Sequence, residues 1–590
     1  MKSLAEELNL LPIPRELRKL EGAVILHEDT APTHQAIRPD EVNQPEGYRL
    51  RIEADRVSLV AHDEAGLFYG LATLRQMPIG RECPAVEIED WPALAVRGVH
   101  WDISRNRVPT MDTLFMMIDR LASWKVNVLQ LYIEHTFAYP SHPQVWKGYS
   151  PLTPEQVQQL DGYCRDRHME LIPAQASFGH MHHWLKHDHY RPLAECPDGW
   201  STAFNPNPGE PFTLCPLDPG SLGLVESIYD ELLPHFSSRR VHAGFDETFE
   251  LGEGRSAELC QQNGVGRVYL DFLRRVCEVI RDRQREMIVF GDVLVRHPDL
   301  LRDLPDGITV QHWGYDAAYP FDQELPVFVD AGVPVWVCSS TSNYCSLTGR
   351  THRAIQNIKN AAIAAVKFGA QGLMNTEWGD HGNWHSLTTS WLGLAYGAAM
   401  AWSPQDNEEL DVADALNKHV FQDDADVMGH LLYDAGNVYR ITNPDSFDVI
   451  PFYVLQQASS SRKRRRDQMT SLALPALEES RAVLAELRSR LPDAAMRCQD
   501  ASTVQGELEL GIDLFDHACE IAAFARHRGL SKIHEAARQM PESIVRRQRD
   551  LMRRQREVWL LRSRPGGLDE SLRWYDPAWL KMHDAVPQPA

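Results

Sequence analysis

The stretch 240-RVHAGFDETFELGEGRS-256 begins as a short apolar segment, ends at two adjacent carboxylates and continues into a glycine-rich loop. Asp246 and Glu247 repel each other when both are ionised, so their placement side by side needs an explanation. Paired acids can stabilise the start of a helix, because the helix dipole is positive there. They can also share acid–base catalysis when their surroundings separate their pKa values. The rest of the sequence has to decide between these interpretations.

The segment 240–245 is one of eight short apolar runs that alternate with helical stretches between residues 93 and 403. Between the first two runs, residues 110–124 place Leu114, Met117 and Ile118 on one helical face. Eight such strand–helix units are typical of a (β/α)8 TIM barrel. The expected strands are 96–103, 127–133, 170–175, 240–245, 287–291, 308–312, 333–338 and 371–376.

The regions on either side of this barrel have different patterns. Residues 1–92 are expected to form a small α/β domain, because 48-YRLRIEADRVSLVAHD-63 alternates like a strand and residues 64–77 have helical periodicity. Residues 404–590 indicate a mostly helical C-terminal region. Its expected helices are 470–491, 503–527 and 542–561.

Composition and charge exclude several classes of function. The 590 residues include 60 Lys and Arg against 82 Asp and Glu, a formal net charge of −22, so we expect no nucleic-acid or membrane partner. The basic run 461-SRKRRRDQ-468 is therefore interpreted as a solvated segment. The N-terminus lacks the apolar core of a signal peptide, no apolar run approaches the ~18 residues of a membrane span, and the 10 cysteines are scattered. These features favour a cytoplasmic protein.

Chemistry in a (β/α)8 barrel occurs at the carboxyl ends of the strands. In this sequence the expected strand ends carry carboxylates, an arginine, histidines and aromatic rings. Charged groups can bind the hydroxyls of a sugar and aromatic rings can stack on its apolar faces, so the pattern predicts a sugar site. The side chains are Asp102 and Arg105 after the first strand, Glu134 and His135 after the second, His180 after the third, Asp246 and Glu247 after the fourth, Asp292 after the fifth, Trp313 after the sixth, Asn343 and Tyr344 after the seventh, and Glu377, Trp378 and Asp380 after the eighth.

Simpler explanations exist for each residue taken alone. Asp292 could cap a following helix, Arg105 could belong to a surface ion pair, and Trp313 and Trp378 could be ordinary core aromatics. Their joint placement at strand ends favours a functional site.

The histidine-rich stretch 180-HMHHWLKHDH-189 also suggests a metal site. Metal-dependent barrel hydrolases usually place a histidine pair on the first strand, where this sequence has only His100. We therefore expect no metal and no other cofactor, and a metal-dependent barrel hydrolase is kept as a less favoured alternative.

Several motifs resemble those of the family 20 glycoside hydrolases, the exo-acting β-N-acetylhexosaminidases. The motif 97-RGVHWDISRN-106 is similar to the family's opening motif, 177-SFGHM-181 to its Gly-His stretch, and 242-HAGFDE-247 to its His-x-Gly-x-Asp-Glu signature. The likeness covers roughly residues 1–400, and the leading α/β domain resembles the family's non-catalytic domain. The resemblance implies hydrolysis of terminal β-linked GlcNAc or GalNAc with retention, in which the substrate's own acetamido oxygen is the nucleophile.

The resemblance also implies roles for the site residues. Glu247 would be the general acid and base, and Asp246 would accept the acetamido N–H and stabilise developing positive charge. Arg105 and Asp380 would bind the ring hydroxyls, and Tyr344 would donate to the acetamido oxygen. The remaining residues implied are His180 beside the acid, Trp313 and Trp378 as walls, and Asp102, Glu134 and Asp292 as supporting carboxylates.

Two positions depart from the family pattern. Phe290 stands where a tryptophan often closes the acetamido pocket, and Phe245 stands where glycine is usual. A non-catalytic N-acetylhexosamine-binding homologue therefore remains an alternative. The helical tail lies outside the resemblance and could extend the fold, pack on the barrel or mediate a homodimer.

Overall fold

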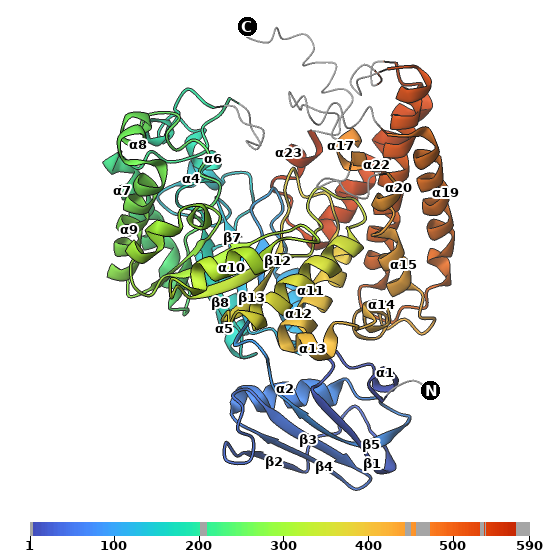
Figure 1. Ribbon diagram of the computed structural model, residues 1–590. Coiled ribbons are helices and arrows are strands. Elements are labelled where there is room, and N and C mark those ends of the chain that lie inside the picture. Colours follow the sequence, from blue (N-terminus) through green and yellow to red (C-terminus); the bar gives the residue numbers. More distant parts are fainter. Residues whose placement is uncertain are drawn as a thin grey trace.

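Eight parallel strands close into a barrel in the middle of the chain (Figure 1). The computed structural model describes residues 4–200, 209–442, 450–455, 472–530, 536 and 539–573. Each barrel strand pairs with the next and the last pairs with the first, which confirms the (β/α)8 fold class expected from the sequence. The strands are β6 (Val96–Asp102), β7 (Val128–Ile133), β8 (Glu170–Gln175), β9 (Arg240–His242), β10 (Glu286–Phe290), β11 (Thr309–Trp313), β12 (Val335–Ser340) and β13 (Gly372–Glu377).

Strand β9 is shorter than the sequence predicts, because it ends at His242 and not at residue 245. The backbone of Gly244 and Phe245 has a φ of 75° at both residues, and Glu247 has a φ of 52°. An extended strand cannot continue through positive φ angles. The paired acids therefore lie on an irregular segment directly after the strand.

Helices surround the barrel and bury one face against it. In α3 (Met111–Ser123), Leu114, Met117 and Ile118 are fully buried, as the helical periodicity predicts, and Thr110 caps the first turn by accepting from the Thr113 N–H. The other helices of this region are α4 (Pro143–Trp146), α5 (Pro154–Arg165), α6 (His182–Leu185), α7 (Pro219–Leu232), α8 (Ala257–Asn263), α9 (Val265–Asp282), α10 (Phe321–Val329), α11 (Thr351–Lys367) and α12 (Leu387–Trp402).

The barrel interior changes from apolar to polar along its axis. Near the amino ends of the strands, side chains such as Val128, Ile288 and Met374 form an apolar cluster of their own. Further along, buried polar side chains replace them, and His100 Nδ1 lies 2.6 Å from Gln130 Oε1. The functional site lies beyond this polar layer, at the carboxyl ends.

The N-terminal domain is a five-stranded sheet with helix α2 (Glu64–Arg75) packed against it. The strand order is β1-β5-β3-β4-β2, and the β2/β4 pair is parallel while the others are antiparallel. Figure 1 shows this domain at the amino ends of the barrel strands. Helix α1 (Leu4–Leu8) precedes the strands β1 (Glu16–Ile25), β2 (His34–Ile37), β3 (Tyr48–Glu53), β4 (Arg56–Ala61) and β5 (Glu82–Asp90).

The stretch 48–63, which alternates like a strand, forms two strands, the hairpin of β3 and β4. The buried positions are even-numbered in β3 and odd-numbered in β4. This change of phase marks the turn, since one continuous strand would keep the same alternation. Strands β1, β2 and β5 were not predicted.

Buried polar groups join the N-terminal domain to the barrel. Lys125 Nζ donates to Asp90 Oδ2 at 2.7 Å and to the Tyr48 hydroxyl at 2.9 Å. Trp402 Nε1 donates to the other oxygen of Asp90 at 2.8 Å. Removing Lys125 would leave the Asp90 carboxylate charged and buried, so the two domains depend on each other at this interface.

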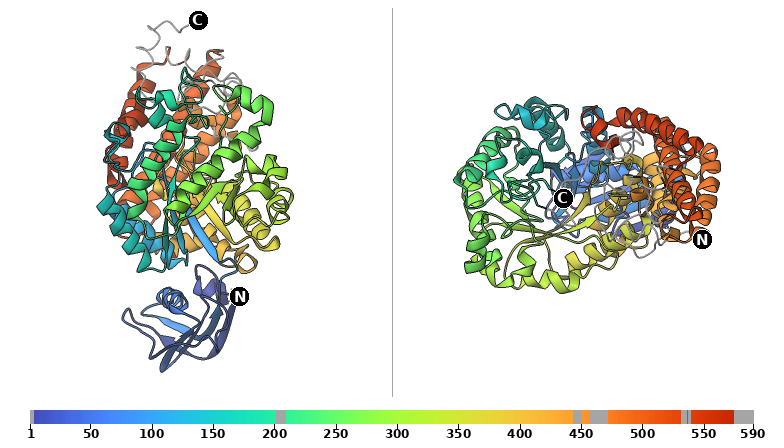
Figure 2. Two further views of the ribbon diagram at one scale, coloured as in Figure 1. Left: turned by 90° about the vertical axis from the view of Figure 1, so that its left-hand side faces the viewer. Right: turned by 90° about the horizontal axis from the view of Figure 1, so that it is seen from above.

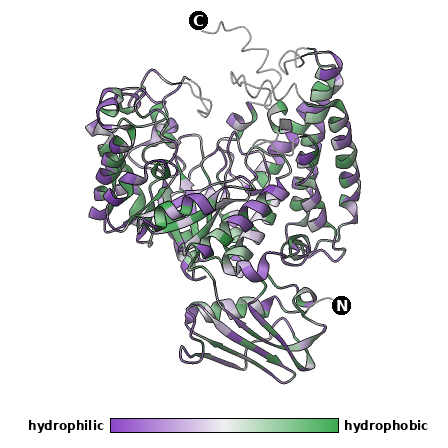
Figure 3. Cartoon of the chain, viewed as in Figure 1, coloured by the Kyte–Doolittle hydropathy of each residue, from purple (hydrophilic) through white to green (hydrophobic). Residues whose placement is uncertain are grey.

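The C-terminal region is mostly helical in the part that the structure describes and packs along one side of the barrel (Figures 1 and 2). Its long helices show alternating hydrophobic and hydrophilic bands, whereas the barrel strands are mainly hydrophobic (Figure 3). The basic run 461–468 lies outside the described residues. The helices are α13 (Pro404–Asn407), α14 (Val412–Leu416), α15 (Met428–Ala435), α16 (Tyr439–Thr442), α17 (Ile450–Leu455), α19 (Leu474–Arg490), α20 (Ala501–His527), α22 (Glu542–Arg562) and α23 (Leu568–Arg573).

None of the helices in the described ranges combines the length and apolarity needed to cross a membrane.

Candidate active site

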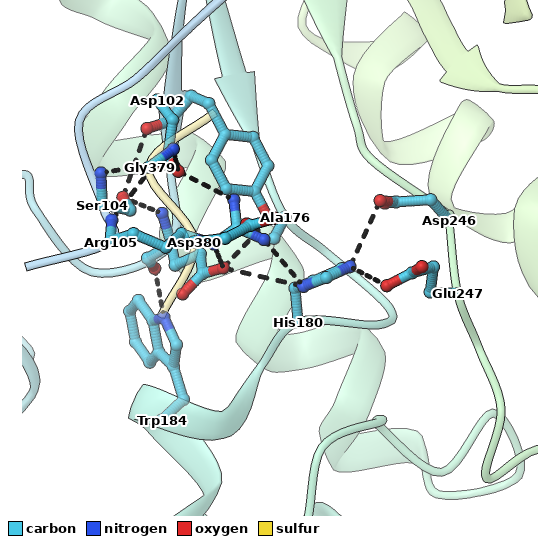
Figure 4. Close-up of polar contacts among 12 residues, drawn as sticks. Asp102, Ser104, Arg105, Ala176, His180, Trp184, Asp246, Glu247, Gly379 and Asp380 are labelled. Atoms are coloured by element: carbon cyan, nitrogen blue, oxygen red, sulfur yellow. Dashed lines mark hydrogen bonds and ion pairs between the residues drawn. The ribbon is translucent and has the colours of Figure 1, made fainter. Parts of the chain in front are cut away.

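Arg105 lies at the centre of a group of carboxylates at the carboxyl ends of the strands (Figure 4). Its Nη1 is 3.2 Å from Asp102 Oδ2, and its Nε is 3.5 Å from Glu134 Oε1 and 3.9 Å from Asp380 Oδ1. Burial lowers the pKa of a guanidinium, but these negative charges raise the pKa of Arg105 well above its usual value. Arg105 is therefore a fixed cation between the ends of β6, β7 and β13, and not a surface pair partner.

Asp102 connects the first and last strand ends of the barrel. Its Oδ1 accepts from the Ser104 N–H at 2.8 Å and its Oδ2 accepts from the Gly379 N–H at 3.0 Å. These bonds fix the position of the loop that carries Arg105 relative to the loop that carries Asp380.

His180, in the loop after β8, lies between carboxylates from two other strand ends, those of β7 and β9. Its Nε2 lies 3.2 Å from Asp246 Oδ2 and 3.5 Å from Glu247 Oε2, and its Nδ1 lies 3.7 Å from Glu134 Oε1. Burial lowers the pKa of an imidazole, but the charge of Asp246 and its hydrogen bond raise the pKa of His180 to about 10. His180 is therefore an imidazolium at neutral pH.

Asp246 and Glu247 occupy different environments although they are adjacent. The side chain of Asp246 is 11% exposed and that of Glu247 is 30% exposed. Burial raises the pKa of Asp246, but the charge and hydrogen bond of His180 outweigh it, so the pKa is lowered. Helix α8 begins only at Ala257, so the pair does not start a helix.

Asp292 supports the backbone of this acidic pair. Its Oδ2 accepts from the Glu247 N–H at 3.2 Å. Burial, followed by the charge of Asp246, raises the pKa of Asp292 to about 7. The following short helix has Val293 at its N-cap, so Asp292 is not a helix cap.

Phe245 adopts a left-handed backbone conformation, with a φ of 75°, which glycine adopts more readily than any other residue. Its side chain is 1% exposed and packs against Phe178, Tyr269 and Phe272. The Tyr269 hydroxyl donates to the Phe245 carbonyl at 2.9 Å. This aromatic packing holds the strained backbone, and it draws the phenyl ring into the core, away from the acids.

Gly179 is required where the third strand-end loop meets the acidic pair. A Cβ at this position would lie 2.5 Å from the Asp246 carbonyl oxygen. Only glycine allows this approach, which brings His180 beside the two acids.

Aromatic rings form a wall on the β11 and β13 side of the site. Trp378 Nε1 donates to the Tyr315 hydroxyl at 2.8 Å, and Tyr315 stacks on Trp313 with ring centroids 5.1 Å apart. The ring of Tyr344 lies 6.0 Å from that of Tyr315. The structure thus brings together the three aromatic residues predicted from the sequence, through a fourth that was missed. Tyr315 follows Trp313 by two residues, so its position just after the sixth strand could have identified it as a site residue.

Tyr132 was also missed by the sequence analysis. The guanidinium of Arg105 lies 4.7 Å from the ring centre of Tyr132 and 4.9 Å from that of Trp378. The Tyr132 hydroxyl donates to Glu134 Oε1 at 3.1 Å. A tyrosine inside a strand has no distinctive sequence pattern, because β-strands are rich in aromatic residues.

Phe290 lies in the barrel interior beneath the aromatic wall. It is fully buried, and its ring centre is 4.2 Å from that of His242, 5.5 Å from that of His100 and 6.2 Å from that of Trp378. Burial lowers the pKa of His100 to about 4 and that of His242 well below its usual value. The floor below Trp378 therefore consists of a phenyl ring and two neutral imidazoles.

Glu134, His135 and His183 offer atoms within 4.8 Å of one another, which is close enough to consider a metal ion. The two imidazole rings are stacked, with centroids 3.6 Å apart and an angle of 17° between their planes. Lone pairs in nearly parallel stacked planes cannot both point at one ion. In addition, Lys186 Nζ lies 3.1 Å from His183 Nδ1, so a cationic group already faces this cluster. The residues present do not fit a metal centre.

The barrel and its acidic, aromatic-lined site define the class of this protein as a glycoside hydrolase. The model of glycosyl hydrolase family 20, catalytic domain, matches residues 95–391, and that of domain 2 of the same family matches residues 14–91. This chain belongs to glycosyl hydrolase family 20, as the sequence motifs indicated.

Curated relatives carry hexosaminidase names. Beta-hexosaminidase 1 of Coccidioides posadasii is 30% identical over 227 residues, which are 34% of this chain and 37% of that protein. Hexosaminidase D of Homo sapiens is 27% identical over 217 residues, which are 36% of this chain and 41% of that protein. The matched regions therefore span about two-fifths of the length of these relatives.

Solved structures share the fold at low sequence identity. The GH20 exo β-N-acetylglucosaminidase of Vibrio harveyi in complex with N-acetylglucosamine has a TM-score of 0.57 and 15% identity, covering 71% of this chain and 78% of that one. The chitobiase of Flavobacterium johnsoniae has a TM-score of 0.58 and 16% identity, covering 91% of this chain and 97% of that one. The second likeness extends beyond the barrel into the C-terminal region.

Proposed function

We propose that this protein hydrolyses terminal, non-reducing β-linked N-acetylhexosamine, GlcNAc or GalNAc, with retention of configuration and with assistance from the substrate's acetamido group. The observation that carries the proposal is His180 between Asp246 and Glu247, with one acid buried beside the imidazolium and the other more exposed. Family membership and the names of the curated relatives support the same substrate class.

In the first step, the acetamido carbonyl oxygen attacks the anomeric carbon and the bond to the leaving oxygen breaks. Glu247 donates its proton to that oxygen, and a cyclic oxazolinium intermediate forms. In the second step, the Glu247 carboxylate takes a proton from water. The resulting hydroxide equivalent attacks the anomeric carbon, opens the ring and restores the acetamido group. Two displacements at the same carbon give retention.

Asp246 is suited to stabilising the intermediate, because positive charge develops on the acetamido nitrogen. A fixed carboxylate that accepts this N–H orients the oxygen for attack and lowers the energy of the charged state. The lowered pKa of Asp246 keeps it ionised during this step. Glu247, the next residue, then carries the proton. Two adjacent acids suit this reaction because the acetamido group and the leaving oxygen are close together on the same sugar.

Arg105 and Asp380 are suited to binding the ring hydroxyls. Hydrogen bonds to charged groups contribute roughly 1.5–3 kcal/mol each, more than neutral ones. The face formed by Trp313, Tyr315 and Trp378 offers an apolar surface for the sugar, and Tyr344 is assigned to the acetamido oxygen. Nothing in this set selects between the two orientations of the 4-hydroxyl, so both GlcNAc and GalNAc are proposed substrates.

The proposal is tested by measuring 4-nitrophenol release from the β-N-acetylglucosaminide, the β-N-acetylgalactosaminide and the plain β-glucoside, with and without a chelator. Chelator-resistant turnover of the two N-acetyl sugars, with none of the glucoside, is expected. Turnover of the glucoside at a similar rate would contradict the role of the acetamido group. Loss of activity with chelator would indicate the metal-dependent alternative, and binding of N-acetylglucosamine without any turnover would indicate a binding protein.

A further inference from the structure

The loop between β13 and α12, residues 378–386, carries Trp378 and Asp380 into the site. Four successive residues of this loop have positive φ, and three of them are not glycine. Such a conformation costs about 1 kcal/mol or more for each non-glycine residue, so surrounding contacts must hold it. The φ angles are 20° at Asp380, 45° at His381, 97° at Gly382 and 54° at Asn383.

Helix α23 of the C-terminal region supplies two of these contacts through one residue. The Ser571 hydroxyl donates to the Gly382 carbonyl, and the Ser571 carbonyl accepts from Trp384 Nε1 at 3.2 Å. Ser571 is 1% exposed. One bond therefore falls on the strained part of the loop, two residues from Asp380, and the other falls on Trp384, directly after that part.

A second contact fixes the end of the same loop. Arg107 Nη1 donates to the His385 carbonyl at 2.6 Å, and its Nε donates to the Ser563 hydroxyl at 3.0 Å. The Arg107 guanidinium also lies 4.6 Å from the ring centre of Trp559 on α22. The C-terminal region thus contacts the loop directly at residues 382 and 384, and at residue 385 through Arg107 of the loop after β6.

The segment that carries Ser571 packs closely against the loops of the barrel. Leu568 and Leu572 form a buried cluster with Trp559. A Cβ at Gly567 would lie 2.1 Å from the Asn106 carbonyl oxygen in the loop after β6. The Tyr149 hydroxyl, in the loop after β7, donates to Glu570 Oε2 at 2.7 Å. Segment 562–573 therefore touches the loops after β13, β6 and β7, which are neighbours in the barrel.

We propose that Ser571 is a positioning residue for the sugar site: through Gly382 and Trp384 it sets the loop that places Asp380 opposite Arg105. This assigns the C-terminal region a part in the affinity for the ring hydroxyls. The inference rests on the proposed function and deepens it. The family's catalytic-domain model ends at residue 391, so this support comes from a part of the chain that the model does not cover.

The two acids lie after β9, across the barrel from the segment that Ser571 occupies. A displaced β13–α12 loop weakens contacts that the substrate makes equally in the ground state and the transition state. Such a loss raises KM and leaves kcat nearly unchanged. A general loss of structure would not separate the two constants in this way.

The test compares Ser571→Ala with Ser480→Ala, using 4-nitrophenyl β-N-acetylglucosaminide. Ser480 is a matched control, because it is also fully buried in the C-terminal region but its hydroxyl donates to the Ala476 carbonyl of its own helix, at 2.8 Å, and not to a loop of the site. Ser571→Ala is expected to raise KM roughly 5- to 20-fold, because the displaced Asp380 loses part of one charged hydrogen bond to the sugar. The kcat of the variant is expected to stay within about 2-fold of the wild-type value. Ser480→Ala is expected to change neither constant.

A double-mutant cycle then asks whether Ser571 acts through Asp380. In an Asp380→Ala background, Ser571→Ala is expected to change KM by less than about 2-fold, because the group that it positions is gone. An equal effect in both backgrounds, or a fall in kcat with KM unchanged, would overturn the inference. If Ser571→Ala does not fold, Trp384→Phe removes the indole N–H bonded to Ser571, together with part of the ring, and must likewise raise KM while kcat stays nearly unchanged.

Hydrogen exchange separates this inference from the proposed function. Amides of residues 378–386 are expected to exchange faster in Ser571→Ala than in the wild type and in Ser480→Ala. This result would support the role of Ser571 in holding the loop even if no N-acetylhexosaminide were hydrolysed. Unchanged exchange in that loop would contradict it whatever the substrate.

Discussion

The Nε2 atom of His180 lies 3.2 Å from Oδ2 of Asp246, and both side chains are largely buried. Each group stabilises the charged form of the other, since the pKa of His180 is raised to about 10 and that of Asp246 is lowered. Asp246 would face the acetamido nitrogen, and its lowered pKa therefore depends on a cation, His180, from a different strand end.

Replacing His180 by glutamine removes that cation. The pKa of Asp246 then rises, so the acid limb of the kcat/KM profile is expected to move to higher pH by ~1–3 units, the usual effect of a neighbouring opposite charge. We expect kcat/KM at the optimum to fall by about 10²-fold, as for the loss of one preorganised electrostatic contact. The measurement is a pH profile of both proteins, and superimposable acid limbs would contradict the coupling.

Replacing Glu247 by glutamine removes the proposed proton donor but keeps the shape of the side chain. General acid catalysis contributes about 10²–10⁴-fold, and most of it is needed when the leaving group is a poor one. We expect a far larger loss of kcat/KM, which reports the step that breaks the glycosidic bond, with a sugar leaving group, as in a chitobiose-type disaccharide, than with 4-nitrophenol. Equal losses with the two leaving groups would argue against Glu247 as the acid.

Asp292 gives a stability prediction. Its pKa is raised to about 7 by burial and by Asp246, whereas an unfolded aspartate titrates near 3.9. Because the folded state holds the proton more tightly, this group lowers the free energy of unfolding as pH rises from about 4 to 7. Asp292→Asn keeps the acceptor for the Glu247 N–H and cannot ionise. The Tm of the variant relative to the wild type is expected to increase between pH 5 and pH 8, and a constant difference would refute the shift.

The sequence predicted the barrel well because its strands are buried on both sides and read as uninterrupted apolar runs. The polar residues at the strand ends were found for the same reason, since each follows directly after such a run. Tyr315 and Tyr132 were missed because single aromatic residues near strands are common. The stretch 48–63 was not divided into β3 and β4, because the change in alternation at residues 53–57 was not recognised as a turn.

Long-range contacts were beyond prediction from the sequence. Ser571 bonds to Gly382 across 189 positions of the chain, and nothing near Ser571 in the sequence marks it as a neighbour of the site. The conformation of Phe245 was equally hidden, because its positive φ depends on rings from the third strand-end loop and from α9 that surround its side chain.

Phe245 provides a test of that conformation. Truncating a buried phenylalanine to alanine costs roughly 3–5 kcal/mol. At ordinary positions glycine is less stable than alanine by ~0.5–1 kcal/mol, but at a φ of 75° alanine is the strained residue. Phe245→Gly is therefore expected to be at least as stable as Phe245→Ala in urea unfolding. The usual order, with alanine clearly more stable, would show that the backbone is not held in the left-handed region.

The measurement that tests the central claim most directly is the rate of hydrolysis of 4-nitrophenyl glycosides whose N-acetyl group carries no, one, two or three fluorine atoms. Fluorine withdraws electrons from the carbonyl and weakens its oxygen as a nucleophile. If the acetamido oxygen attacks the anomeric carbon, kcat/KM must fall with every added fluorine. A rate that does not depend on the number of fluorine atoms would mean that the acetamido oxygen is not the nucleophile, which would contradict the account.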